Sequence, residues 1–179
     1  MPPRSDTHTT PPSVLISEVG PRDGLQSVRD TMPTAHKIAW IEAVHQAGLR
    51  EIEVGSLVPA RVLPQMADVD AIVRHARTLP GLTVMALVPN RQGAEAALAA
   101  GAHKLTIPVS ASEAHSLANV RRSRADMVAQ VRSIVALKNE RAPQVQIEVG
   151  SLTVVTGPEA EDLPGIDPLA PGPTVAEVR

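Results

Sequence analysis

Arg22 and Asp23 are the residues of this sequence whose types and position are best suited to chemistry. They stand side by side in a turn bounded by Pro21 and Gly24, directly after the apolar stretch 14–19. A carboxylate at the end of a strand is a good ligand for a hard cation, and a guanidinium beside it can stabilise an oxyanion. An Arg-Asp dipeptide by itself is more often a surface loop with a local ion pair, so the pair indicates a site only together with residues further along the chain.

Further polar side chains follow the other strands that the sequence predicts. They are Gln26, Glu53, Ser56, Asn90, Ser110, Ser112, Glu113 and Asn119. The carboxyl ends of parallel strands meet at one edge of the sheet, where the sites of parallel α/β folds lie. Glu53 could instead face solvent on a half-exposed strand, whereas inside a barrel it would need a partner, for which Arg22 is the obvious candidate. The segment 110–113 could simply cap the next helix.

Alternating strands and helices must position these side chains. Periodicity predicts strands at 14–19, 51–55, 82–88, 104–109 and 144–149, and helices at 34–48, 68–78, 91–100 and 124–141. This alternation indicates parallel βαβ units, as in a doubly wound sheet or a TIM barrel. The glycine-rich dinucleotide fingerprint is missing after the first strand, which disfavours the doubly wound sheet. A complete barrel typically takes about 250 residues, so we predict an α/β fold that is an incomplete, N-terminal portion of a (β/α)8 TIM barrel, with four βα units plus a fifth strand.

The chain divides into three parts by composition. Residues 1–12 are rich in Thr and Pro and are predicted to form a flexible N-terminal tail. Residues 13–149 are predicted to form the partial barrel domain. Residues 150–179 hold five prolines and four glycines without helical or strand periodicity, which is typical of an aberrant or disordered tail.

The overall composition restricts the class of protein. The apolar fraction of 43% is enough for a core, which must consist of Ala, Val, Leu and Ile because Phe and Tyr are absent. A net charge of −2 without a basic stripe argues against nucleic-acid binding. There is no cysteine, and neither a signal peptide nor an apolar run long enough to span a membrane can be recognised. We therefore expect a soluble, cytoplasmic protein.

Taken together, these segments resemble the hydroxymethylglutaryl-CoA lyase family, within the metal-dependent TIM-barrel lyases and aldolases that share a pyruvate carboxyltransferase-like domain. Leu25, together with the preceding Gly20-Pro21, favours the lyase branch, since the related synthases have Arg-Asp-Gly-Glu-Gln and the carboxyltransferases Arg-Asp-Ala-His-Gln at this motif. The resemblance covers roughly residues 13–149. Its segments are 18–26, 47–49, 52–56, 64–66, 87–90, 93–101 and 110–113, with Asn119.

The resemblance implies a retro-Claisen cleavage of 3-hydroxy-3-methylglutaryl-CoA to acetoacetate and acetyl-CoA, the chemistry of leucine degradation. It implies a divalent cation, Mg²⁺ or Mn²⁺, with Asp23 as a metal ligand. Arg22 would be the catalytic cation that stabilises the enolate at the thioester oxygen and binds substrate. Glu53 would be the catalytic carboxylate that orients Arg22. Gln26 and Asn119 would bind the acyl-CoA substrate, Asn119 at its CoA portion.

The sequence also departs from the family pattern. The family has a His-x-His metal pair and a lid cysteine beyond the fifth strand, and neither is present. We interpret the chain as a truncated or frameshifted lyase and expect no turnover from it alone. The alternatives are a catalytically dead half-barrel that acts as an interaction module, and a lyase for a related 3-hydroxyacyl-CoA. The free edge of the fifth strand, with an apolar inner face, predicts self-association into a homo-oligomer.

Overall fold

Five parallel strands form one sheet in the computed structural model, which describes residues 14–152. The strands pair in the order in which they follow along the chain, unlike a doubly wound sheet, whose order reverses at a switch point. The predicted half-barrel is thereby confirmed. The predicted tail at 1–12 lies outside the described residues, as does the predicted tail at 150–179 except for residues 150–152, which continue the fifth strand. The strands are β1 (Ser17–Glu18), β2 (Glu51–Ser56), β3 (Thr83–Leu87), β4 (Lys104–Ser110) and β5 (Gln146–Leu152).

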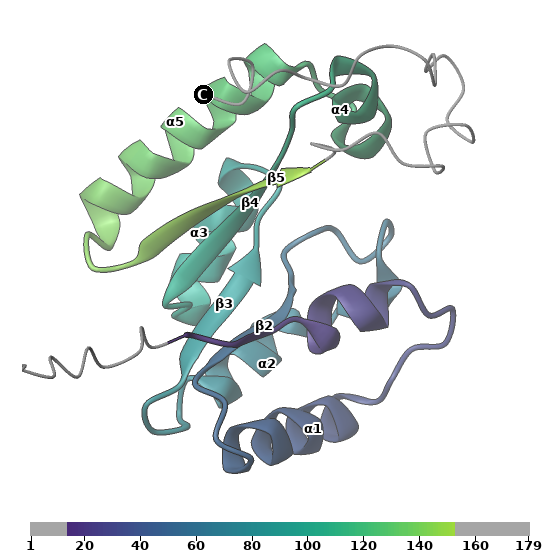
Figure 1. Ribbon diagram of the computed structural model, residues 1–179, viewed down its shortest axis with the longest axis vertical. Coiled ribbons are helices and arrows are strands. Elements are labelled where there is room, and N and C mark those ends of the chain that lie inside the picture. The colour runs from purple at the N-terminus through teal and green to yellow at the C-terminus, as the bar shows by residue number, and fades with distance from the viewer. Residues whose placement is uncertain (1–13, 153–179) are drawn as a thin grey trace, which may run out of the picture.

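The helices cover one face of this sheet. Figure 1 looks onto the other face, with α2 and α3 behind the strands. Around the outside, α1 contacts α2, α2 contacts α3, and α3 contacts α5, so the helices follow one another as in a barrel wall. The helices are α1 (Thr34–Gln46), α2 (Val69–Ala76), α3 (Arg91–Ala100), α4 (Glu113–Val120) and α5 (Arg124–Arg141), with short turns at Gly20–Gly24 and Pro64–Met66. None of the helices between residues 14 and 152 is long and apolar enough to cross a bilayer.

The hydrophobic core lies between the strands and the helices. It joins outward-facing strand residues to one side of α2, α3 and α5, and its fully buried members include Ile52, Val73, Val84, Leu105, Ile107, Met127, Ile134 and Leu137. Burial of this kind contributes about 1.5–3 kcal/mol for each large aliphatic side chain. The helices therefore stabilise the sheet from outside, and the inner face is left to other side chains.

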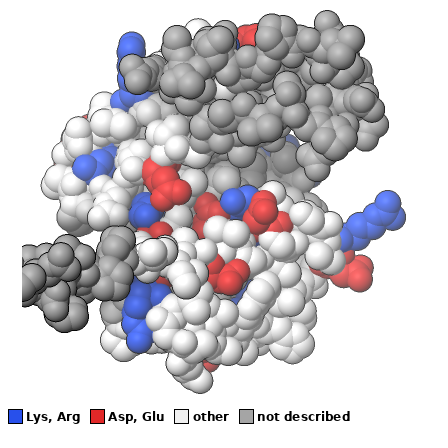
Figure 2. All heavy atoms as spheres, in the orientation of Figure 1, with Lys and Arg blue, Asp and Glu red and all other residues white. Residues whose placement is uncertain are grey.

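The inner face of the sheet carries charged side chains, so the expectation of an apolar inner face is wrong. Lys104 lies at the centre, where its Nζ donates to Glu51 Oε2 at 2.8 Å and to Glu148 Oε2 at 3.2 Å. Burial lowers the pKa of Lys104, but the two carboxylates outweigh it and the net pKa is raised. Acidic and basic side chains lie close together across the middle of this face (Figure 2). Polar groups make it a poorer template for nonspecific aggregation than an apolar face would be.

Of two helix ends predicted from the sequence, the glycine that ends α3 is confirmed and the threonine cap of α1 is wrong. Gly101 ends α3 in a left-handed conformation with φ +94°, as expected for a terminating glycine. Thr34 does not cap α1. It is the first helical residue, Pro33 precedes it, and its hydroxyl donates to Asp68 Oδ2 at 2.7 Å. This bond joins α1 to the start of α2 instead.

His103, which precedes β4, should make the stability of the protein depend on pH. Burial and the nearby charge of Arg77 lower its pKa from the ordinary 6.5, against a hydrogen bond to the Leu82 carbonyl. Its Nδ1 also accepts a hydrogen bond from the Val84 amide at 3.1 Å, which requires an unprotonated ring nitrogen. The native state thus holds His103 neutral, while the unfolded chain takes up a proton below its ordinary pKa. The stabilisation is present above 6.5 and is lost as the pH falls through the lowered pKa.

The measurement is the melting temperature of the wild type and of His103→Gln at about pH 7.5 and about pH 5.5. Glutamine keeps an acceptor for the Val84 amide but does not titrate. We expect the wild type to lose more of its melting temperature on acidification than the variant. Equal losses in the two proteins would show that His103 does not carry the effect.

Candidate active site

A single π-helical turn, Gly20–Gly24, presents Arg22 and Asp23 directly after β1. The carbonyl of Val19 accepts hydrogen bonds from the amides of Arg22 at 3.0 Å and Asp23 at 2.7 Å. Glycine at position 20 leaves room for its neighbours, because an added Cβ would lie 2.7 Å from Glu18 Oε1 and 3.0 Å from the Trp40 ring, so Glu18 would have to move. π-Helical geometry is rare in proteins, and where it occurs as a single turn within a helix it is frequently found at functional sites. The local sequence therefore fixes the backbone from which both side chains project.

Arg22 is the centre of a hydrogen-bonded group of four side chains. Its Nε donates to Glu53 Oε2 at 2.6 Å, and its Nη1 donates to Asp23 Oδ1 at 2.7 Å. Gln26 Nε2 donates to the same Asp23 oxygen at 3.2 Å. The structure thus brings together Arg22, Asp23, Gln26 and Glu53, which the sequence had predicted separately. Glu53 faces the interior, not solvent.

Burial divides the four side chains into two kinds. Glu53 is 1% exposed, and its Oε1 is buried without a partner among the described residues. The Arg22 side chain is 16% exposed, and Nη2 has no partner in residues 14–152. The Asp23 side chain is 57% exposed. Glu53 can therefore orient Arg22 from the buried side of the group. Arg22 Nη2 and the second Asp23 oxygen remain available to a ligand.

The polar residues after β3 and β4 lie at the same edge of the sheet but have local partners. Asn90 Oδ1 caps α3 by accepting from the Gly93 amide at 2.9 Å. Ser112 caps α4, a helix that the sequence pattern had not predicted. Asn119 is exposed on α4, and no hydrogen bond within 14–152 joins it to the Arg22 group. Its predicted contact with the CoA portion stays a prediction.

A pair that sequence reasoning missed lies at the end of β4. Ser110 Oγ and His115 Nδ1 are 2.7 Å apart, and Ser110 is buried. The sequence did allow 110–113 to cap the next segment. A helix placed directly after Ser112 would have revealed this pair, because it returns His115 toward the strand end. The pair links the start of α4 to the carboxyl end of β4.

The donor set fits a cation that retains water and substrate oxygens. Within residues 14–152 no three His, Cys, Asp or Glu side chains form a metal-binding cluster. Mg²⁺ usually keeps several waters and takes one or two carboxylates plus substrate oxygens. Asp23 is exposed enough to be such a carboxylate, and its Oδ1 is already held in place by Arg22 and Gln26.

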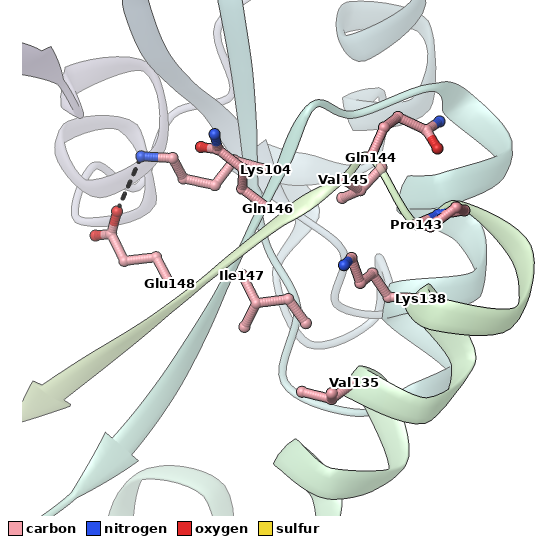
Figure 3. A pocket seen from close by; sticks show the side chains of 9 residues that line it. All are labelled: Lys104, Val135, Lys138, Pro143, Gln144, Val145, Gln146, Ile147 and Glu148. Atoms are coloured by element: carbon pink, nitrogen blue, oxygen red, sulfur yellow. Dashed lines mark hydrogen bonds and ion pairs between the residues drawn. The ribbon is translucent and has the colours of Figure 1, made fainter.

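Two hollows lie at the opposite, amino-terminal edge of the sheet. One, of about 520 Å³, runs along β5 and is lined by Lys104, Lys138 and Glu148 among others (Figure 3). The other, of about 560 Å³, includes Arg77, His103 and Gln144. Neither touches the Arg22 group, which lies at the carboxyl edge of the sheet.

Comparison with known proteins identifies the family. The HMGL-like family model matches residues 13–163, most of the chain. The chain belongs to the HMGL-like family. Among curated relatives, the hydroxymethylglutaryl-CoA lyase of Pseudomonas mevalonii is 38% identical over 134 residues, which is 75% of this chain and 44% of that protein. The mitochondrial lyase of Macaca fascicularis is 43% identical over 116 residues, 65% of this chain and 36% of that protein.

Solved structures agree with this HMGL-like assignment. The hydroxymethylglutaryl-CoA lyase of Pseudomonas aeruginosa superposes with a TM-score of 0.79 at 32% identity, over 92% of this chain and 51% of that one. An HMG-CoA lyase of Acinetobacter baumannii, solved with coenzyme A and 3-methylmalate, gives a TM-score of 0.78 at 29% identity, over 92% and 50% of the two chains. The chain thus spans about half the length of the relatives it matches.

Proposed function

We propose that this chain carries the Arg-Asp part of a hydroxymethylglutaryl-CoA lyase site. The observation that supports it most is the group in which Glu53 holds Arg22 by a 2.6 Å hydrogen bond while Arg22 holds Asp23 at 2.7 Å. A buried carboxylate thereby fixes a guanidinium at the carboxyl edge of the sheet, with one nitrogen left for substrate. Such a pre-organised donor suits a reaction in which negative charge develops on an oxygen.

In the proposed reaction the substrate's tertiary hydroxyl loses its proton and the adjacent C–C bond breaks. The electron pair passes to the thioester as an enolate, the oxidised fragment leaves as acetoacetate, and protonation of the enolate carbon gives acetyl-CoA. Arg22 Nη2 would donate to the thioester oxygen, and Glu53 would keep the guanidinium in its plane. A divalent cation, Mg²⁺ or Mn²⁺, would supply Lewis acidity toward the substrate's hydroxyl and carboxylate, held on the protein by Asp23. Gln26 would orient Asp23.

A longer 3-hydroxyacyl-CoA is a second candidate substrate. One curated relative, 39% identical over 147 residues, is the 3-hydroxy-3-isohexenylglutaryl-CoA/hydroxy-methylglutaryl-CoA lyase of Pseudomonas aeruginosa. The two substrates differ in the group on C3 and share the carboxylate, hydroxyl and thioester that Arg22 and the cation would bind.

Relatives are named as both mitochondrial and cytoplasmic, and we propose a cytoplasmic location for this one.

A chimera tests the proposed function without relying on activity of this chain alone. Residues 13–152 would be joined to the C-terminal half of the P. aeruginosa lyase, whose fold superposes on this chain. We expect the chimera to release acetoacetate from hydroxymethylglutaryl-CoA when Mg²⁺ or Mn²⁺ is added and not with EDTA. A chimera that folds, shown by a cooperative thermal transition, but neither binds nor cleaves this thioester would overturn the proposal.

A further inference from the structure

The inward-pointing side chains of the half-barrel lie in layers. The ion pair between Lys104 and Glu51 shows by how many residues β2 and β4 are shifted relative to each other within one layer. Along the sheet, Glu51 pairs with Thr83, whereas Lys104 pairs with Met85, two residues further along β3. Lys104 nevertheless bonds to Glu51 across the interior at 2.8 Å. Strands in a barrel are tilted, so side chains of alternate strands that share a layer are offset along the sheet. The offset between β2 and β4 is therefore two residues.

The same offset places Thr106 opposite Glu53, one layer above the Lys104 ion pair. Glu53 pairs with Met85 of β3, and Met85 pairs with Lys104 of β4. Thr106 is two residues further along β4 than Lys104, which is the offset expected for the layer of Glu53. Glu53 and Thr106 both belong to the inward-facing set, because the alternating residues Ile52, Leu105 and Ile107 lie in the outer core. The next layer of the interior thus contains a carboxylate and a hydroxyl.

Both of these side chains have a buried oxygen without a partner. Glu53 Oε1 and Thr106 Oγ1 are two of three such atoms in the described part of the chain, the third being Gln65 Oε1 on a different segment. The two atoms do not bond to each other directly in this structure. Buried polar groups are nearly always satisfied, and an ordered water is the usual partner when no side chain is available.

We propose that Glu53 Oε1 and Thr106 Oγ1 bind one water molecule inside the half-barrel, and that Thr106 is thereby a positioning residue for the Glu53 carboxylate. The water donates to Glu53 Oε1 and bonds to the Thr106 hydroxyl, which can accept or donate. The Lys104 ammonium in the neighbouring layer has three donors, of which the two carboxylates use two, so one donor is left that can reach toward this water. Three partners are the usual number for a buried water.

This arrangement explains how Glu53 can hold Arg22 in one orientation. A carboxylate with one oxygen on Arg22 and the other free could rotate about its terminal bond, which has a broad torsional minimum. Fixing Oε1 from below leaves Oε2 directed at Arg22 Nε, where it lies at 2.6 Å. The inference concerns the interior of this chain and holds whether or not the proposed lyase activity is confirmed.

The experiment uses the full chain and two measurements that need no substrate. In a high-resolution crystal structure we expect a water within about 2.7–3.2 Å of both oxygens. In ¹⁵N NMR we expect the Arg22 Nε–H to exchange with solvent about tenfold faster in Thr106→Val, equivalent to about 1.4 kcal/mol less protection. Thr106→Ser keeps the hydroxyl and should exchange like the wild type.

Thr83→Val is the matched control, since it removes a threonine hydroxyl from the inner face of β3 at the level of Glu51. It should leave the Arg22 exchange rate unchanged. The inference is wrong if the crystal structure has Thr106 bonded directly to Glu53, or if the space between them is dry. It is also wrong if Thr106→Ser exchanges as fast as Thr106→Val. If the valine variant does not fold, the crystal structure decides, because a dry space or a direct bond between the two side chains contradicts the inference without any variant.

Discussion

Arg22→Gln should lower kcat of the chimera by about 10²–10³-fold, the usual effect of removing one pre-organised donor from a developing oxyanion. The reason lies in the geometry of the candidate site. Arg22 is held by Glu53 and Asp23, so its position is set before substrate binds, and its charge matters most where the enolate forms. The expected change in KM is much smaller. Steady-state kinetics at saturating Mg²⁺ measures both constants.

Arg74→Gln is the control for loss of an arginine near a carboxylate. Arg74 lies on the surface of α2 and pairs with Asp70 one turn away, with both side chains more than half exposed. Exposed pairs of this kind contribute about 0.3–0.5 kcal/mol, and Arg74 is remote from the Arg22 group, so kcat should not change. If Arg22→Gln retained near-normal kcat, the pair Arg22-Asp23 would be the surface ion pair that its sequence alone also allows.

Much of the fold was predictable because the periodic pattern and the helix ends agree. Helix α5 runs over the predicted residues, and Ser123 and Asp126 form a reciprocal capping box at its start. Strand β1 is shorter than predicted, since only Ser17–Glu18 pairs with β2. The apolar residues before it have strand character but no partner among the described residues, and Val14 is 83% exposed. Sequence periodicity indicates extended structure and cannot supply the neighbouring strand.

The contents of the inner face were harder to predict, because alternation shows that a strand has two faces but not which face is the core. Glu51 and Glu53 alternate with Ile52 and Val54, a pattern that equally suits a solvent-exposed side. Only the assembled sheet shows that these carboxylates meet Lys104 from β4 and Arg22 from the turn after β1. The pairing of Arg22 with Glu53 was the one such contact expected, since consecutive strands of a barrel are neighbours.

Asp23→Ala should raise the Mg²⁺ concentration needed for half-maximal activity of the chimera by at least the ~10–100-fold that loss of an outer-shell partner typically costs. Asp23 is the exposed carboxylate of the group, and Arg22 and Gln26 hold its Oδ1, so its loss removes a positioned anionic oxygen. Part of the activity should return at high Mg²⁺, because substrate oxygens and water remain as ligands. Rescue by metal distinguishes this role from the kcat role expected for Arg22.

The control for the metal titration is Asp70→Ala, which removes an equally exposed carboxylate from α2. The Mg²⁺ concentration for half-maximal activity should be the same in Asp70→Ala as in the wild type. Wild-type protein that has been treated with a chelator and then given Mg²⁺ should also show this same value. Isothermal titration with Mn²⁺ in place of Mg²⁺ provides a direct measure of affinity for the same proteins. If Asp23→Ala bound Mn²⁺ as tightly as the wild type, Asp23 would not be a ligand. Its contact with Arg22 would then serve only to orient the guanidinium.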